Sequence, residues 1–190
     1  MIIDGHSHAC GEYSDPDKII DIMNQLGIDK TVLCPGLRQN AKKDIFPTPA
    51  CLMNKKNSMF FLNKIIRMAN YITESSGALD ERNELVHQFI KKYPDRLIQF
   101  YWADPLRKNI MDELNEKYSA WKFGGIKLHQ CAEGFKNDSI QMHQIASFAG
   151  QKKLPVFIHP YSKNEVKKIV PLAVLRTQAG LFDRTLLFPL

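Results

Sequence analysis

Residues 1–10, MIIDGHSHAC, place two histidines one residue apart directly after an apolar run. The run is too short for a helix and predicts a first β-strand. Because successive side chains of a strand alternate between its two faces, His6 and His8 would share one face with Asp4. Two imidazoles in this arrangement can bind one cation. The alternative is a hydrated surface pair, but the apolar strand and the adjacent Gly5 favour a metal site.

Strands and helices alternate along the chain as far as His159. Ser14–Asp17 supplies a capping side chain and a proline for a first helix, which Gly27 ends. Further strands are predicted at residues 29–34, 96–101, 125–129 and 155–159, and further helices at 80–93, 110–118 and 138–149. Strand, helix and strand at this spacing indicate parallel βαβ units. No glycine-rich phosphate loop follows the first strand, so an α/β fold of the (β/α)8 TIM-barrel type is favoured, with about five to six βα units present.

Residues 35–79 interrupt this alternation. A polar segment leads into a helix near residues 60–73, and the segment is too long for a simple connection. We expect a lid-like insertion at the mouth of the barrel that carries Arg38, whereas a surface excursion is the alternative. The expected organisation is a partial barrel over residues 1–170 and an atypical tail over 171–190.

Composition narrows the classes of function. The 190 residues are 44% hydrophobic, which suits one globular domain, and the net charge is +6. The lysines are dispersed in pairs, so nucleic-acid binding is not expected. Four cysteines without a C-x-x-C spacing, no signal peptide and no membrane-spanning apolar run predict a cytoplasmic protein with reduced thiols. His87 and His143 lie within predicted amphipathic helices, where we expect solvated outer faces.

Four stretches together resemble one known family. They are DGHSH at 4–8, NELVHQFIKKYPDRLIQFYWADP at 83–105, GGIKLH at 124–129 and LPVFIHP at 154–160. In this order they resemble the amidohydrolase-related (amidohydrolase 2) branch of the metal-dependent amidohydrolase superfamily, which includes hydrolases and the aminocarboxymuconate-semialdehyde decarboxylase type. The resemblance covers residues 1 to about 170 and implies a TIM barrel with a metal centre.

Candidate ligands follow from the strand ends and from this resemblance. His159 closes an apolar run as His6 closes the first, and the family has a metal-binding histidine there, so we expect His6, His8 and His159 to bind a divalent metal ion. Zn²⁺ is the expected ion, with Fe²⁺, Mn²⁺ and Co²⁺ as alternatives. Lys127 and His129 share one face of a strand and are expected, with Arg38, to contact the substrate. Solvated or salt-bridged mouth residues are the alternative for Lys127 and His129.

The tail departs from the family pattern. The resemblance implies a sixth strand ending in a catalytic His and an eighth ending in an Asp, but no histidine follows His159, and Asp183 precedes an apolar stretch instead of closing it. The catalytic residue is therefore unassigned. We expect a truncated or frame-shifted product with impaired activity.

The sequence therefore predicts a metal-dependent hydrolase that acts on a small, anionic substrate through a metal-activated water. A non-hydrolytic decarboxylase of the same family is the alternative, since fold does not separate the two reactions. A third alternative is a non-catalytic fragment that binds metal, or a partner such as a second copy, through an unpaired sheet edge. The expected partner is a small molecule, without nucleic acid or membrane.

Overall fold

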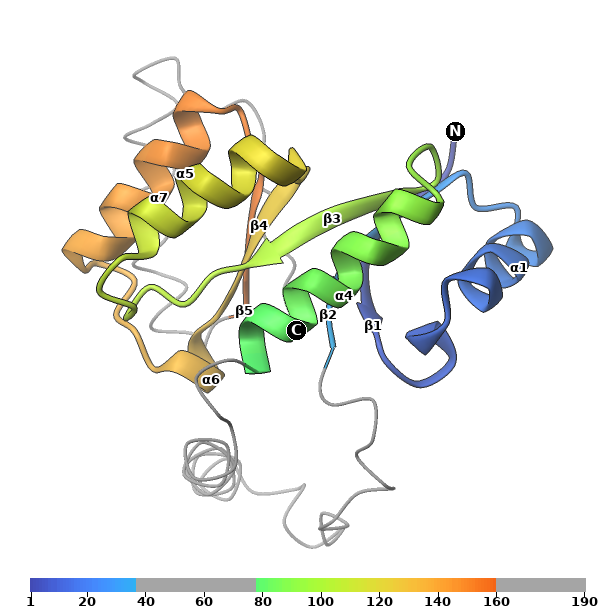
Figure 1. The fold of residues 1–190 in the computed structure, drawn as a ribbon, viewed down its shortest axis with the longest axis horizontal. Helices are drawn as coiled ribbons and strands as arrows, with labels where there is room; N and C mark the ends of the chain where they lie inside the picture. The colour runs from blue at the N-terminus through green and yellow to red at the C-terminus, as the bar shows by residue number, and fades with distance from the viewer. Residues whose placement is uncertain (37–77, 160–190) are drawn as a thin grey trace, which may run out of the picture.

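The computed structural model describes residues 1–36 and 78–159, and in this part five parallel strands form one curled sheet in the order β1-β2-β3-β4-β5 (Figure 1). The strands are β1 Ile3–Ala9, β2 Lys30–Pro35, β3 Leu97–Trp102, β4 Gly125–His129 and β5 Val156–His159. The helices are the 3₁₀ turn η1 Gly11–Ser14, α1 Pro16–Leu26, α4 Ala78–Lys92, α5 Ile110–Trp121, α6 Gln130–Glu133 and α7 Ile140–Gln151. This half-barrel confirms the predicted α/β barrel-type fold.

Local sequence signals account for the boundaries of α1. The Asp15 carboxylate accepts a hydrogen bond from the backbone N–H of Asp17, and Pro16 occupies the first turn, where its missing N–H costs nothing. Gly27 ends the helix with φ 67, a left-handed conformation that glycine adopts without strain. The cap and the glycine stop were both predicted from sequence. The short elements η1 and α6 were not.

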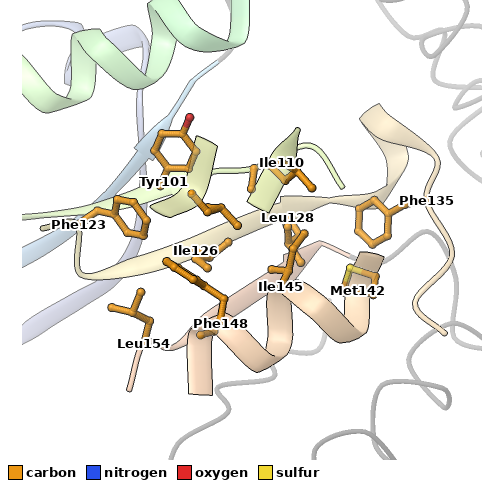
Figure 2. Close-up of a cluster of buried hydrophobic side chains, with 13 residues drawn as sticks. Tyr101, Ile110, Phe123, Ile126, Leu128, Phe135, Met142, Ile145, Phe148 and Leu154 are labelled. Atoms are coloured by element: carbon orange, nitrogen blue, oxygen red, sulfur yellow. The ribbon is translucent and has the colours of Figure 1, made fainter. Parts of the chain in front are cut away.

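Two apolar clusters attach the helices to one face of the sheet. Leu97 and Tyr101 on β3 point to this helix-covered face, Leu97 toward α1 and α4 and Tyr101 toward α5 and α7. Figure 2 shows the cluster that contains Tyr101, in which side chains from β3, β4, α5 and α7 gather. Each large apolar side chain buried in this way contributes roughly 1.5–3 kcal/mol. Because these strand residues face the helices, the residues that alternate with them face the opposite, inner face of the sheet.

The inner face of the curled sheet has its own small core. Val32, Cys34 and Phe100 are buried there, with Ile98 and Phe157 packed against them. A Cβ atom on Gly125 would lie 2.5 Å from the Phe100 ring, so glycine at this position lets the ring fill the inner face. Because side chains alternate along a strand, every second residue beyond these core positions also points inward. The residues at the ends of the strands continue this inner face.

Buried polar groups join α4 to the end of β3. The side chain of Asn83 is fully buried, donates to the Trp102 carbonyl oxygen over 2.9 Å and accepts from the Trp102 N–H over 2.9 Å. Gln99 Nε2 in turn donates to the Asn83 carbonyl oxygen at 3.0 Å. One asparagine thus satisfies both backbone groups of Trp102, which would otherwise be costly to bury. Trp102 consequently has a fixed backbone position.

Some sequence-based expectations concern other parts of the chain. The inserted segment with Arg38 and the tail at 171–190 lie outside the described residues. The proposed boundary near residue 170 stays a prediction for the same reason. Within residues 1–36 and 78–159, no helix has the length and apolar character needed to cross a membrane.

Candidate functional site

Five basic side chains gather on the inner face at the C-terminal ends of three strands. They are His6 and His8 from β1, Lys127 and His129 from β4, and His159 from β5. Period-two alternation places Lys127, His129 and His159 on the same face as the inner core, since Phe157 precedes His159 by two residues and Gly125 precedes Lys127 by two. On β1, His8 pairs with the inner-core residue Cys34, and His6 contacts the Phe157 ring. In TIM barrels the C-terminal ends of the strands carry the active site. The structure therefore brings together all the predicted site residues that it describes.

The curl of the sheet brings its two edge strands into contact across the inner face. His6 on β1 stacks on Phe157 of β5, with ring centroids 4.1 Å apart and an interplanar angle of 26°. The register between β1 and β2 shifts between Asp4 and Ser7, and the Asp4 carboxylate accepts hydrogen bonds from the Ser7 hydroxyl and the His6 N–H. These hydrogen bonds from Asp4 stabilise the irregular part of β1, directly before and at the first histidine of the site.

His8 is held in one tautomer by the neighbouring strand. Its Nδ1 lies 3.0 Å from the carbonyl oxygen of Pro35, which can only accept, so Nδ1 carries the proton. The Nε2 lone pair of His8 is therefore directed away from that bond. A backbone carbonyl that orients the other ring nitrogen is the usual companion of a metal-binding histidine.

Lys127 is the most unusual group in the site, because its side chain is fully buried. Nζ lies 3.2 Å from Nε2 of His6 and 4.0 Å from the centroid of the Phe157 ring. Burial lowers the pKa of Lys127 to about 8, against the opposing influence of Cys34 and Glu133. Among residues 1–36 and 78–159, no carboxylate forms an ion pair with it. The site therefore holds a buried amine without a protein counter-ion in the described part.

Three rings form a stack beside Lys127. The Trp102 indole lies against His129 with centroids 5.4 Å apart, and His129 lies against His159 with centroids 4.5 Å apart and an interplanar angle of 3°. His129 and His159 are direct cross-strand partners in the β4–β5 register, which accounts for the parallel rings. His129 is thus enclosed between an indole and a second imidazole.

All four histidines of the site are neutral near pH 7. Burial lowers the pKa of His6 to about 4, with further lowering from Lys127 and His8. Burial lowers the pKa of His129 to about 3, assisted by the neighbouring His159. The pKa values of His8 and His159 are also lowered by burial. Neutral imidazole is the form that binds metal ions.

The neutral imidazoles of His6, His8 and His159 are chemically suited to bind a divalent metal ion. In this structure, however, their nitrogen atoms are not directed at one common point. Among the described residues, no three His, Cys, Asp or Glu side chains are grouped to hold a metal ion. Nζ of Lys127 lies against Nε2 of His6, which is a nitrogen that a metal would need. Burial raises the pKa of Cys34 to about 12, so it is a neutral thiol and a poor ligand. The three-histidine centre stays a prediction.

Glu133 is a site residue that sequence reasoning missed. It ends the short helix α6, four residues after His129, and its Oε1 accepts a hydrogen bond from Trp102 Nε1 at 2.7 Å. Oε2 is buried and has no hydrogen-bond partner in the described part of the chain. Burial raises the pKa of Glu133 to about 8, Asp104 raises it further, and the Trp102 bond opposes the shift. Its position directly after a strand end was the only available signal.

Replacing Glu133 with glutamine should make the protein more stable at alkaline pH. Free glutamate ionises near pH 4.5, whereas folded Glu133 keeps its proton to about pH 8. The folded state therefore holds the extra proton between these values, and the free energy of unfolding falls as pH rises through this window. Glu133→Gln should remove this fall and gain up to about 5 kcal/mol over the native chain by pH 8.

Urea denaturation at several pH values measures this difference. Glu116→Gln is the matched control, because Glu116 is an exposed glutamate on α5. Equal pH slopes for the native chain and Glu133→Gln would contradict the prediction.

The two remaining histidines lie on outer helices. His143 on α7 is exposed, as predicted. His87 on α4 is half-buried, so the expectation of a solvated side chain was wrong. Its ring stacks on Trp121, the last residue of α5, with centroids 4.5 Å apart. Neither histidine belongs to the site.

Comparison with solved structures identifies the architecture. No protein-family model matches the chain, and no curated protein matches it significantly. The chain is similar to 4-oxalomesaconate hydratase from Rhodopseudomonas palustris, with a TM-score of 0.54, 16% identity and coverage of 96% of this chain and 61% of the hydratase. This chain has the same α/β barrel-type fold as that enzyme. The expectation of that fold, drawn from the sequence resemblance, is confirmed.

Two further structures support the same assignment of fold. An amidohydrolase II matches with a TM-score of 0.51 and 15% identity, over 91% of this chain and 56% of its own. The 2,6-dihydroxybenzoate decarboxylase from Rhizobium matches with a TM-score of 0.50 and 15% identity, over 85% of this chain and 50% of the decarboxylase. This chain thus spans between half and about three fifths of these structures. They are enzymes that carry out different reactions on one fold, so the fold does not choose among the reactions.

Proposed function

We propose that this protein is a metal-dependent hydrolase of the amidohydrolase-related family that acts on a small, anionic substrate. The observation that carries the proposal is the gathering of four neutral histidines and a buried lysine on the inner face at the C-terminal strand ends. A cluster of this kind is expensive to bury, since each polar group loses water, and perturbed titratable groups concentrate at functional sites.

The metal ligands proposed are His6, His8 and His159. The tautomer of His8 supports its role, because the Pro35 carbonyl leaves Nε2 as the available donor atom. For His6 to bind through Nε2, Lys127 Nζ has to move away from that atom. A divalent metal held by these residues would supply Lewis acidity and hydroxide at neutral pH. Zn²⁺ is the ion that we propose, since three imidazoles suit it well.

Lys127 and His129 are proposed to recognise the substrate. A substrate carboxylate would supply the counter-ion that Lys127 lacks among the described residues, and a buried amine pairs strongly with an anion because little water screens them. His129, neutral and enclosed in the ring stack, offers a rigid hydrogen-bonding edge. Arg38 remains a further proposed contact from outside the described part.

Product analysis tests the proposed reaction. The zinc-loaded full chain is incubated with a panel of carboxylate-bearing amides, esters and lactones, and with aromatic and enoic acids. Release of amine, alcohol or acid without CO₂ supports the hydrolase. Release of CO₂ would support the decarboxylase instead, and the absence of turnover across the panel would favour a non-catalytic metal-binding protein.

A Lys127→Met variant should lose more than about tenfold in kcat/KM, because a buried charged hydrogen bond contributes roughly 1.5–3 kcal/mol.

A further inference from the structure

A continuous chain of contacts runs from α6 to the middle of the site. Glu133 Oε1 accepts from Trp102 Nε1 at 2.7 Å, and the Trp102 ring lies against His129 with centroids 5.4 Å apart at 21°. His129 in turn lies against His159. Asn83 fixes the backbone of Trp102, so the indole can move only by rotation of its side chain. A change in the hydrogen bond between Glu133 and Trp102 therefore reaches the His129 ring through the indole, while the Glu133 carboxyl also interacts directly with the His129 backbone.

A carboxyl group is a costly choice for the partner of Trp102. A glutamine would accept the same indole hydrogen bond without burying an ionisable group. Oε2 of Glu133 is buried without a hydrogen-bond partner in the described part of the chain, and such a buried oxygen is costly. Groups that reduce stability and lie beside a binding site are often retained for function. The property that glutamate has and glutamine lacks is the ability to ionise.

We propose that Glu133 is a positioning residue, which acts through the Trp102 indole to set the position of His129, and that its carboxylic acid and carboxylate forms set different positions. A carboxylate accepts a shorter and stronger hydrogen bond from an N–H donor than a neutral carboxyl group does. Ionisation therefore draws the indole toward α6 and changes its overlap with His129. The inference deepens the proposed function, in which His129 contacts the substrate, but the contacts themselves do not depend on that function.

The charged groups around Glu133 determine the pH at which its carboxyl group ionises. Asp104, which follows β3, disfavours a second negative charge, and Lys127 on β4 favours it. His129 is neutral, with a pKa of about 3, and so is His159 behind it. Together with burial, these neighbours place the pKa of Glu133 at about 8. Both forms are therefore accessible within a narrow range above neutral pH.

Nuclear magnetic resonance of the His129 ring in the full chain, without added metal, tests the inference. In the native chain the His129 ring resonances should shift with a midpoint near pH 8, although the pKa of His129 itself is about 3. In Glu133→Gln this shift should vanish while the Trp102 indole N–H resonance keeps its hydrogen-bonded position. In Glu133→Leu, the pH-dependent shift of His129 and the hydrogen-bonded position of the Trp102 indole N–H resonance should both be lost. The His129 signals are assigned by comparison with His129→Asn.

A control is needed for Lys127, because its pKa is also about 8. In Lys127→Met the His129 shift should persist with only a small change of midpoint. Persistence of the shift in Glu133→Gln, its loss in Lys127→Met, or its absence from the native chain would each overturn the proposal. Since the readout requires neither metal nor turnover, failure of the proposed function would leave these spectra unchanged. Glu133→Gln is expected to fold, because it removes a buried ionisable group.

Discussion

Replacing His6 and His8 together with alanine should weaken zinc binding by more than about 100-fold. Loss of a single group that merely orients a ligand already costs roughly 10–100-fold in metal affinity, so loss of two ligands should exceed that range. The remaining ligand, His159, stacks flat against His129, and one imidazole alone holds Zn²⁺ weakly. Isothermal titration of the metal-free chain with Zn²⁺, and metal content after dialysis, measure the effect.

The matched control is His143→Ala, which removes an exposed histidine from α7 and should leave zinc affinity unchanged. His6 also stacks on Phe157, so circular dichroism has to establish that the double variant is folded. Native zinc content in a folded double variant would show that the histidines of β1 do not bind the metal. In that case the pair would be a structural feature of the inner face, and the proposed reaction would lose its basis.

The parts of this site that the sequence predicts are those governed by local periodicity. Alternation along a strand is a property of the backbone itself, so it places His6 with His8, and Lys127 with His129, before any tertiary contact is known. Strand ends were predicted to within about one residue for the same reason: apolar runs stop where the sheet stops. The common inner face then follows from the parallel order of the strands.

The contacts between these pairs could not be predicted, because they depend on how strongly the sheet curls. Lys127 and His6 are 121 positions apart, and their contact requires β4 to face β1 across the barrel interior. The stack of Trp102 on His129 likewise depends on the β3–β4 register. Glu133 lies on a four-residue helix with no hydrophobic period of its own. Such short elements are specified by tertiary packing more than by propensity.

Replacing Asn83 with leucine should cost about 2–4 kcal/mol of stability. The change leaves the Trp102 N–H and carbonyl oxygen buried without their partners, and each unsatisfied buried group costs roughly 1–3 kcal/mol. Urea denaturation measures the loss. Asn115→Leu is the control, because Asn115 is an exposed asparagine whose Nδ2 donates a hydrogen bond within α5, to the Met111 carbonyl oxygen.

The same variant connects stability to the candidate site. Asn83 holds the backbone of Trp102, and the Trp102 indole bridges Glu133 and His129, so Asn83→Leu should also broaden or shift the indole N–H resonance under native conditions. A loss of stability with an unchanged indole resonance would show that Glu133 and His129 alone fix the ring. An unchanged free energy of unfolding would mean that other groups take over both bonds to Trp102, and α4 would then have no part in shaping the site.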